Sequence, residues 1–292
     1  VKKDDIITKE LPLLYKCIKA EKWSKPKGHK NFSHLAMCSR LGPIEVPPEK
    51  LDSFYELYAR DWQKGEALFL SEEAVPKPIV FFDIDVEMEI DGKAWTRENS
   101  ISFALDIHNI IIGCYPRLER KHRECLVGAT EACVKEKNGK SYVKLGLHPY
   151  HPWIGTATEN HMKLRSVLIQ GLATKHGQQL FGHKLVASWH KMIDVDRVKL
   201  PKLRMLGSHK ADFCTCKKQN RKRKKGQEEA EPEAPAVECP HPRGRIDAKR
   251  PYELLTVLNG AGKEDVGRTK WLQAHKAQLL KVVSLRHPVG VL

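Results

Sequence analysis

The sequence lacks any long apolar segment. Of its 292 residues, 41% are hydrophobic and 30% are charged, which is typical of a soluble globular protein. No apolar run approaches the roughly 20 residues that a membrane-spanning helix needs. The opening residues, Val-Lys-Lys-Asp-Asp, do not resemble a secretory signal peptide. We therefore expect no membrane partner and an intracellular, reducing location.

Cysteine is also scarce, and no internal repeat is visible. Eight cysteines at irregular spacings exclude a disulfide scaffold, and in a reducing compartment clustered cysteines more often bind metal. Five isolated cysteines are interpreted as packing residues: Cys17, Cys38, Cys114, Cys125 and Cys133.

Negative charge is in short supply relative to positive charge. The formal net charge is +15, and such an excess attracts polyanions, of which nucleic acid is the commonest in a cell. A generally basic soluble protein is the alternative. The initial Val and the Pro-Val-Gly-Val-Leu ending suggest a segment of a longer polypeptide.

The periodicity of apolar residues predicts an α+β fold with a central, mainly antiparallel sheet. Asn138-Gly139 predicts a tight hairpin turn between two of the strands. Thr156 or Thr158 is expected to cap the last of the helices. A strongly basic run followed by an acidic, proline-containing one predicts a disordered loop over about 217–238. The expected helices are 5–21, 49–64, 98–115 and 156–175, and the expected strands are 78–90, 124–135, 140–148 and 185–198.

The strand at 78–90 carries the most informative motif, Asp83-Ile84-Asp85. Side chains alternate along a strand, so both carboxylates should lie on one face, where they could share divalent cations. Hard cations such as Mg²⁺ held this way suit phosphoryl or nucleotidyl transfer. The alternative is a solvated acidic strand face, because Glu87 and Glu89 continue the alternation.

A second candidate group lies on the strand that ends at His148. Lys144, Gly146 and His148 should share one face, and a cation, a bare backbone and an imidazole in one row could hold a triphosphate. An exposed strand that happens to carry Lys and His is the alternative. The neighbouring His151 and Trp153 are interpreted as structural.

A third candidate group follows at 192–210. Asp194 and Asp196 are expected on one strand face, where either could complete a three-carboxylate metal site. Arg204 and Lys210 are suitable phosphate partners. Ordinary surface charges on a loop are the alternative.

A fourth group matches a structural Zn²⁺ site, since four soft or borderline ligands occur as two close pairs. The pairs are separated by the expected disordered loop, which a metal ion would anchor. Unliganded residues are the alternative. The ligands would be Cys214, Cys216, Cys239 and His241.

Together these motifs resemble the archaeo-eukaryotic primase superfamily, and most closely the primase domains of large eukaryotic DNA viruses, with PrimPol more distant. The matching motifs are Asp83-Ile84-Asp85, Gly146-Leu147-His148, a hydrophobic-Asp pair at Asp194 or Asp196, and residues 244–252, Gly-Arg-Ile-Asp-Ala-Lys-Arg-Pro-Tyr. Arg204 and Lys210 also keep the spacing seen in relatives. Two departures are Gly146, where relatives have Ser, and the two candidates for the third Asp.

The resemblance implies an RRM-like primase fold with a zinc-binding insertion, divided as 1–75, 76–213 (catalytic core), 214–245 (zinc insertion) and 246–292. It implies primer synthesis on single-stranded DNA from NTPs or dNTPs during viral replication. Asp83, Asp85 and the third Asp, Asp194 or Asp196, would hold two Mg²⁺ or Mn²⁺ ions, and Lys144, His148, Arg204 and Lys210 would bind the triphosphate. A replicative helicase would act in cis or in trans, in the host nucleus or at a cytoplasmic replication site. The competing hypotheses are a zinc-containing DNA-binding module without catalysis and a metal-dependent nuclease.

Overall fold

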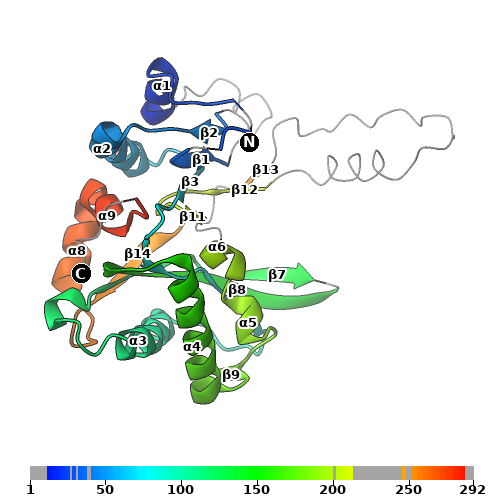
Figure 1. The fold of residues 1–292 in the computed structure, drawn as a ribbon. Helices are drawn as coiled ribbons and strands as arrows, with labels where there is room; N and C mark the ends of the chain where they lie inside the picture. Colours follow the sequence, from blue (N-terminus) through cyan, green and yellow to red (C-terminus); the bar gives the residue numbers. More distant parts are fainter. Residues whose placement is uncertain are drawn as a thin grey trace, which may run out of the picture.

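A computed structural model describes residues 12–26, 28–30, 32–37, 41–137, 139–199, 202–212, 245–247 and 251–286 (Figure 1). Its helices and 3-10 turns are α1 (Leu13–Ala20), η1 (Pro48–Lys50), α2 (Leu51–Gln63), α3 (Arg97–Gly113), η2 (Arg120–His122), α4 (Thr158–His176), α5 (Trp189–Met192), α6 (Val195–Lys199), α8 (Val266–Ala274) and α9 (Lys276–Val283). Its strands are β1 (His34–Ala36), β2 (Pro43–Ile44), β3 (Leu70–Glu73), β4 (Ile79–Phe81), β5 (Ile84–Glu89), β6 (Cys125–Ala129), β7 (Cys133–Lys137), β8 (Lys140–Gly155), β9 (Gln179–Leu180), β10 (His183–Lys184), β11 (Lys202–Arg204), β12 (Lys210–Asp212), β13 (Arg245–Asp247) and β14 (Glu253–Leu258).

The central sheet is organised around β8, a strand of 16 residues. On one edge, β8 pairs with β4 and then with β5, and on the other edge it pairs with β6 and β7. Strand β14 extends the sheet beyond β6. Every pairing between named strands in the described residues is antiparallel, as the sequence predicted. The α+β class with antiparallel sheets is therefore confirmed.

The central sheet separates two apolar cores. One core lies between the sheet and helices α3, α4 and α5, and it takes the side chains of Leu145 and Leu147 from β8 (Figure 1). The other core takes Tyr150 from β8 and packs against α1, α2, α9 and a smaller sheet. Residues of opposite parity on one strand therefore enter opposite cores, as strand geometry requires.

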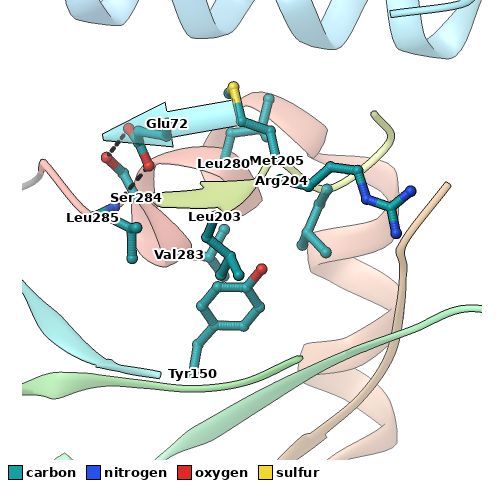
Figure 2. Close-up of a pocket in the computed structure, with 10 residues that line it drawn as sticks. Glu72, Tyr150, Leu203, Arg204, Met205, Leu280, Val283, Ser284 and Leu285 are labelled. Atoms are coloured by element: carbon teal, nitrogen blue, oxygen red, sulfur yellow. Dashed lines mark hydrogen bonds between the residues drawn. The ribbon is translucent and has the colours of Figure 1, made fainter. Parts of the chain in front are cut away.

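The smaller sheet has the order β11-β3-β1-β2, so strands that are distant in sequence lie side by side in it. A small pocket lies where this sheet meets β8 and α9 (Figure 2). Tyr150 rises into the pocket from β8, while Glu72 of β3 accepts hydrogen bonds from the Ser284 hydroxyl and the Leu285 backbone N–H. These contacts attach the C-terminal helices to the N-terminal sheet.

Several expected boundaries need correction. The strand expected over 78–90 is divided into β4 and β5, with Phe82 and Asp83 between them. The run expected over 124–135 is also divided, because Thr130 turns to bond Gly146 of β8 through both its backbone N–H and its side-chain Oγ1. Of the helix expected over 5–21, residues 12–21 are described, and its helical part begins at Leu13.

The largest correction concerns 185–198, which was expected to be a strand. This segment forms α5 and α6, and only isolated bridges from Leu185 and Ile193 connect it to β5. Trp189 and Met192 are buried at helical spacing, so packing of one helical face determined the local structure. Asp194 and Asp196 therefore do not share a strand face.

Two smaller predictions, on the cap of α4 and on the packing of Cys114, were wrong. The predicted hairpin is confirmed. Helix α4 has Ala157 at its N-cap, without a capping hydrogen bond from Thr156 or Thr158. Cys114 is exposed rather than packed, whereas Cys125 is fully buried. The β7–β8 hairpin forms as expected, with Gly139 at a φ of +71°. A positive φ of this kind favours glycine.

Candidate active site

Asp83 and Asp85 lie on the same face of the central sheet. Their neighbours Phe82, Ile84 and Val86 are fully buried in the core beneath helices α3 and α4. Alternation then directs both carboxylates to the other face, where the side chain of Asp83 is 19% exposed and that of Asp85 is 44% exposed. The sequence prediction of two acids on one face agrees with this arrangement.

His148 is the partner of Asp83. Its Nε2 lies 3.2 Å from Asp83 Oδ1, and its Nδ1 lies 3.3 Å from the Tyr150 hydroxyl. Burial lowers the pKa of His148 and outweighs the opposing effect of Asp83. Burial raises the pKa of Asp83, but His148, Arg197 and Arg204 together leave it below its ordinary value. Near neutral pH the pair is therefore a carboxylate beside a neutral imidazole, whose Nε2–H donates to Asp83.

Lys144 is the partner of Asp85. Its Nζ lies 2.7 Å from Asp85 Oδ2 and 3.6 Å from Glu87 Oε1. Burial lowers the pKa of Lys144, but Asp85 and Glu87 raise it by more, so the net pKa is above its ordinary value and the ammonium stays charged. Lys144 and His148 thus extend from β8 toward Asp85 and Asp83, respectively.

Asp194 is brought to the same place by the segment between α5 and α6. Its backbone N–H donates to the Asp83 carbonyl at 2.9 Å. The Nε of Arg197 lies 3.7 Å from Asp83 Oδ2 and 3.5 Å from Asp194 Oδ2, so one guanidinium joins both carboxylates. Asp196 lies in the first turn of α6, is exposed, and donates its backbone N–H to Asp194 Oδ1.

Tyr252 is a member of the cluster that the sequence assigned no role in the site, although it ends the Arg-Pro-Tyr motif. Its ring stacks on His148 with centroids 3.5 Å apart, and its hydroxyl donates to Asp83 Oδ1 at 3.5 Å. The guanidinium of Arg204, from β11, lies 4.5 Å from the centre of the same ring. Figure 2 shows the Arg204 side chain extending away from Glu72.

The space beside Gly146 is filled by this tyrosine. A Cβ built on Gly146 would lie 2.2 Å from the Tyr252 hydroxyl oxygen and 2.9 Å from Cζ, which is far inside normal contact. The glycine was expected to let a triphosphate approach the backbone. In the structure it lets Tyr252 approach, because a side chain at this position would overlap the tyrosine.

The remaining predicted residues are described in part or not at all. Lys210 begins β12, where its backbone pairs with Asp247 of β13. The predicted zinc ligands, Cys214, Cys216, Cys239 and His241, lie outside the described residues, as do Cys38 and the loop expected over 217–238.

The cluster thus combines Asp83, Asp85 and Asp194 with Lys144, His148 and Arg204 on one sheet face. Carboxylates that lie beside basic side chains are the groups found in sites of metal-dependent phosphoryl and nucleotidyl transfer. Among the described residues, no helix is long and apolar enough to cross a bilayer.

The model of one protein family, described as the C962R protein N-terminal AEP domain, matches residues 33–220. This is more than half of the chain, and the chain belongs to this family of archaeo-eukaryotic primase (AEP) domains, the N-terminal domains of viral primase–helicases. The resemblance inferred from the motifs is thereby confirmed. AEP proteins are primase-type nucleotidyltransferases that use divalent metals and act on DNA and nucleotides. No curated protein matches the sequence.

Proposed function

We propose that this domain is a DNA primase–polymerase, which joins nucleotides into short primers on a single-stranded DNA template during viral DNA replication. The observation that carries the proposal is the convergence of Asp83, Asp85 and Asp194 with Lys144 and His148. These residues come from three separate segments, and Asp83 contacts or shares a partner with members of both other segments.

The carboxylates fit a site for two Mg²⁺ or Mn²⁺ ions. Each of the three is already paired with a cationic or imidazole nitrogen: Lys144 with Asp85, and Arg197 with Asp83 and Asp194. Each carboxylate therefore already lies beside a positively charged group. Mg²⁺ and Mn²⁺ prefer oxygen ligands of this kind. The ions would lower the pKa of the attacking 3′-hydroxyl and neutralise charge on the departing pyrophosphate.

The basic residues would bind the incoming NTP or dNTP. Lys144 of β8 contacts Asp85, and the ring of Tyr252 contacts both His148 and the guanidinium of Arg204 from β11. Donors fixed in place before reaction stabilise the charge that develops on a leaving group. We include Lys210 on its spacing from Arg204, and Gly146 as the residue that makes room for Tyr252.

The partners of the domain follow from the same proposal. The excess of basic residues, which gives a net charge of +15, would attract the phosphates of the template. The affinity for DNA should therefore fall steeply as the salt concentration rises. Cys214, Cys216, Cys239 and His241 would hold a structural Zn²⁺. A replicative helicase would act in cis or in trans, inside the host nucleus or at a cytoplasmic replication site.

The test is incorporation of labelled NTPs and dNTPs on single-stranded DNA with Mn²⁺ or Mg²⁺. The wild-type protein should form short oligomers, and Asp83→Asn should lose the activity while still binding DNA. Glu89→Gln is the matched control, because it removes a carboxylate at the far end of β5, where its partner is Lys184.

The competing functions give different outcomes. DNA binding without incorporation under either metal would indicate a non-catalytic DNA-binding module and would refute the proposal. Loss of labelled DNA without added nucleotides would indicate a nuclease. Equal loss of activity in Asp83→Asn and Glu89→Gln would place the chemistry elsewhere.

A further inference from the structure

A second group of metal-ligating side chains lies on the opposite face of the central sheet. It consists of His108 from α3, Cys125 from β6 and His151 from β8, which are only 2%, 0% and 0% exposed. One ligand atom from each residue lies within 4.8 Å of the others. The sequence suggested only packing roles for Cys125 and His151.

The imidazoles of His108 and His151 lie face to face. Their rings are parallel, with an interplanar angle of 3° and centroids 5.6 Å apart. Nδ1 of His108 and both ring nitrogens of His151 are buried, and they have no hydrogen-bond partner among the described residues. Buried polar atoms are almost always satisfied, and each unsatisfied one costs free energy. Three such nitrogens in one place therefore indicate that a bound group interacts with them.

We propose that His108, Cys125 and His151 form a buried binding site for a transition-metal ion of the Zn²⁺ class. Two imidazoles and one thiolate are ligands that Zn²⁺ accepts. Binding would release the Cys125 thiol proton to solvent as the metal–sulfur bond forms.

This site is distinct from the candidate active site. His151 and His148 belong to the same strand but have opposite parity, so they lie on opposite faces of β8. Cys125 packs with Val127 and Leu258 in the core beneath α3. A metal ion would tie α3 to β6 and β8, directly behind the sheet face that carries Asp83. Its role would be structural, because the site is closed to substrate.

The test must separate this site from the zinc site predicted in the undescribed segment. The background protein is the full chain with Cys214, Cys216 and Cys239 changed to Ser and His241 changed to Asn. It should retain one equivalent of Zn²⁺ after removal of loosely bound metal, and that metal should resist chelators until the protein unfolds. Adding Cys125→Ser or His151→Asn should remove the metal. Cys114→Ser, at an exposed thiol, should not.

A second measurement covers the case in which a core variant fails to fold. A chain whose only cysteine is Cys125, with the other seven changed to Ser, is loaded with Co²⁺ alone. Thiolate-to-cobalt absorption in the near ultraviolet would identify Cys125 as a ligand. Absence of that absorption, or an unloaded background protein, would overturn the proposal and leave trapped water as the partner of the histidines.

Discussion

The two faces of strand β8 place similar side chains in contrasting environments. His148 and His151 are three residues apart and are 1% and 0% exposed, and burial lowers the pKa of both. His148 has a carboxylate on one nitrogen and a tyrosine hydroxyl on the other. Neither nitrogen of His151 has a hydrogen-bond partner among the described residues.

This difference shows how a strand can support two kinds of site at once. On one face, acidic and basic side chains pair with one another close to solvent. These charged groups suit an ionic ligand. On the other face, helices α3 and α4 cover the core, so that only a group bound within it can satisfy the imidazoles. The first arrangement suits exchangeable substrates, and the second suits a permanently bound ion.

The first prediction tests whether the solvent-facing side is a catalytic site. Asp194→Asn should reduce nucleotide incorporation about 100-fold or more, as removal of a group that stabilises the transition state does. Asp196→Asn is the control, because Asp196 is exposed on α6 and contributes its backbone N–H to Asp194. Both are measured by primer extension at saturating metal. The reverse order of effects would make Asp196 the third metal ligand.

The second prediction tests the packing of Tyr252 on that face. Gly146→Ala should destabilise the protein by about 1–3 kcal/mol, because the new Cβ would overlap the Tyr252 hydroxyl. In a Tyr252→Ala background the same substitution should cost far less, because residues in contact are coupled. Chemical denaturation of the four proteins measures the coupling. An unchanged cost in both backgrounds would mean that something other than Tyr252 restricts Gly146.

Much of the front face could be predicted because it depends on strand alternation. Apolar residues at 82, 84 and 86 fix which side of the sheet is buried, and this alone places Asp83 and Asp85 together. The same reasoning gives the row of Lys144, Gly146 and His148. Each of these inferences spans only a few residues of one strand.

The rest depends on contacts that no local pattern encodes. Tyr252 reaches His148 only because β14 returns to the sheet beside β6. The strand expected at 185–198 is helical because its short apolar run fits either period, and packing of Trp189 and Met192 favours the helix. His108, Cys125 and His151 come from three elements, so no sequence spacing relates them.

The third prediction concerns pH and compares buried histidines on the two faces. His161 lies on the helix-covered side, donates Nε2–H to the Phe81 carbonyl, and has a pKa lowered by burial to about 4. As pH falls below about 6.5, His161 becomes protonated in the unfolded state but stays neutral in the folded state, so the free energy of unfolding decreases. This stability is fully present above that pH and disappears progressively toward about pH 4.

His161→Gln should therefore flatten the dependence of unfolding free energy on pH between 6.5 and 5, by up to about 1.4 kcal/mol per pH unit. His148→Gln should flatten it less, because Asp83 opposes the effect of burial on the His148 pKa. Denaturation curves at several pH values make the comparison. Equal slopes for the two variants would show that the carboxylate has no such effect.

The last prediction concerns Arg197, the cation shared by Asp83 and Asp194. Its side chain is 43% exposed, so Arg197→Ala should change stability by less than about 1 kcal/mol. It should nevertheless lower the Mn²⁺ concentration needed for half-maximal incorporation several-fold, because the guanidinium competes with the metal for two carboxylates. Lys199→Ala, which removes an exposed charge from the same helix, is the control. A higher Mn²⁺ requirement in Arg197→Ala would mean instead that Arg197 orients the carboxylates for the metal. Metal binding on the solvent-facing side would then depend on the ion pairs within the site as much as on the metal ligands.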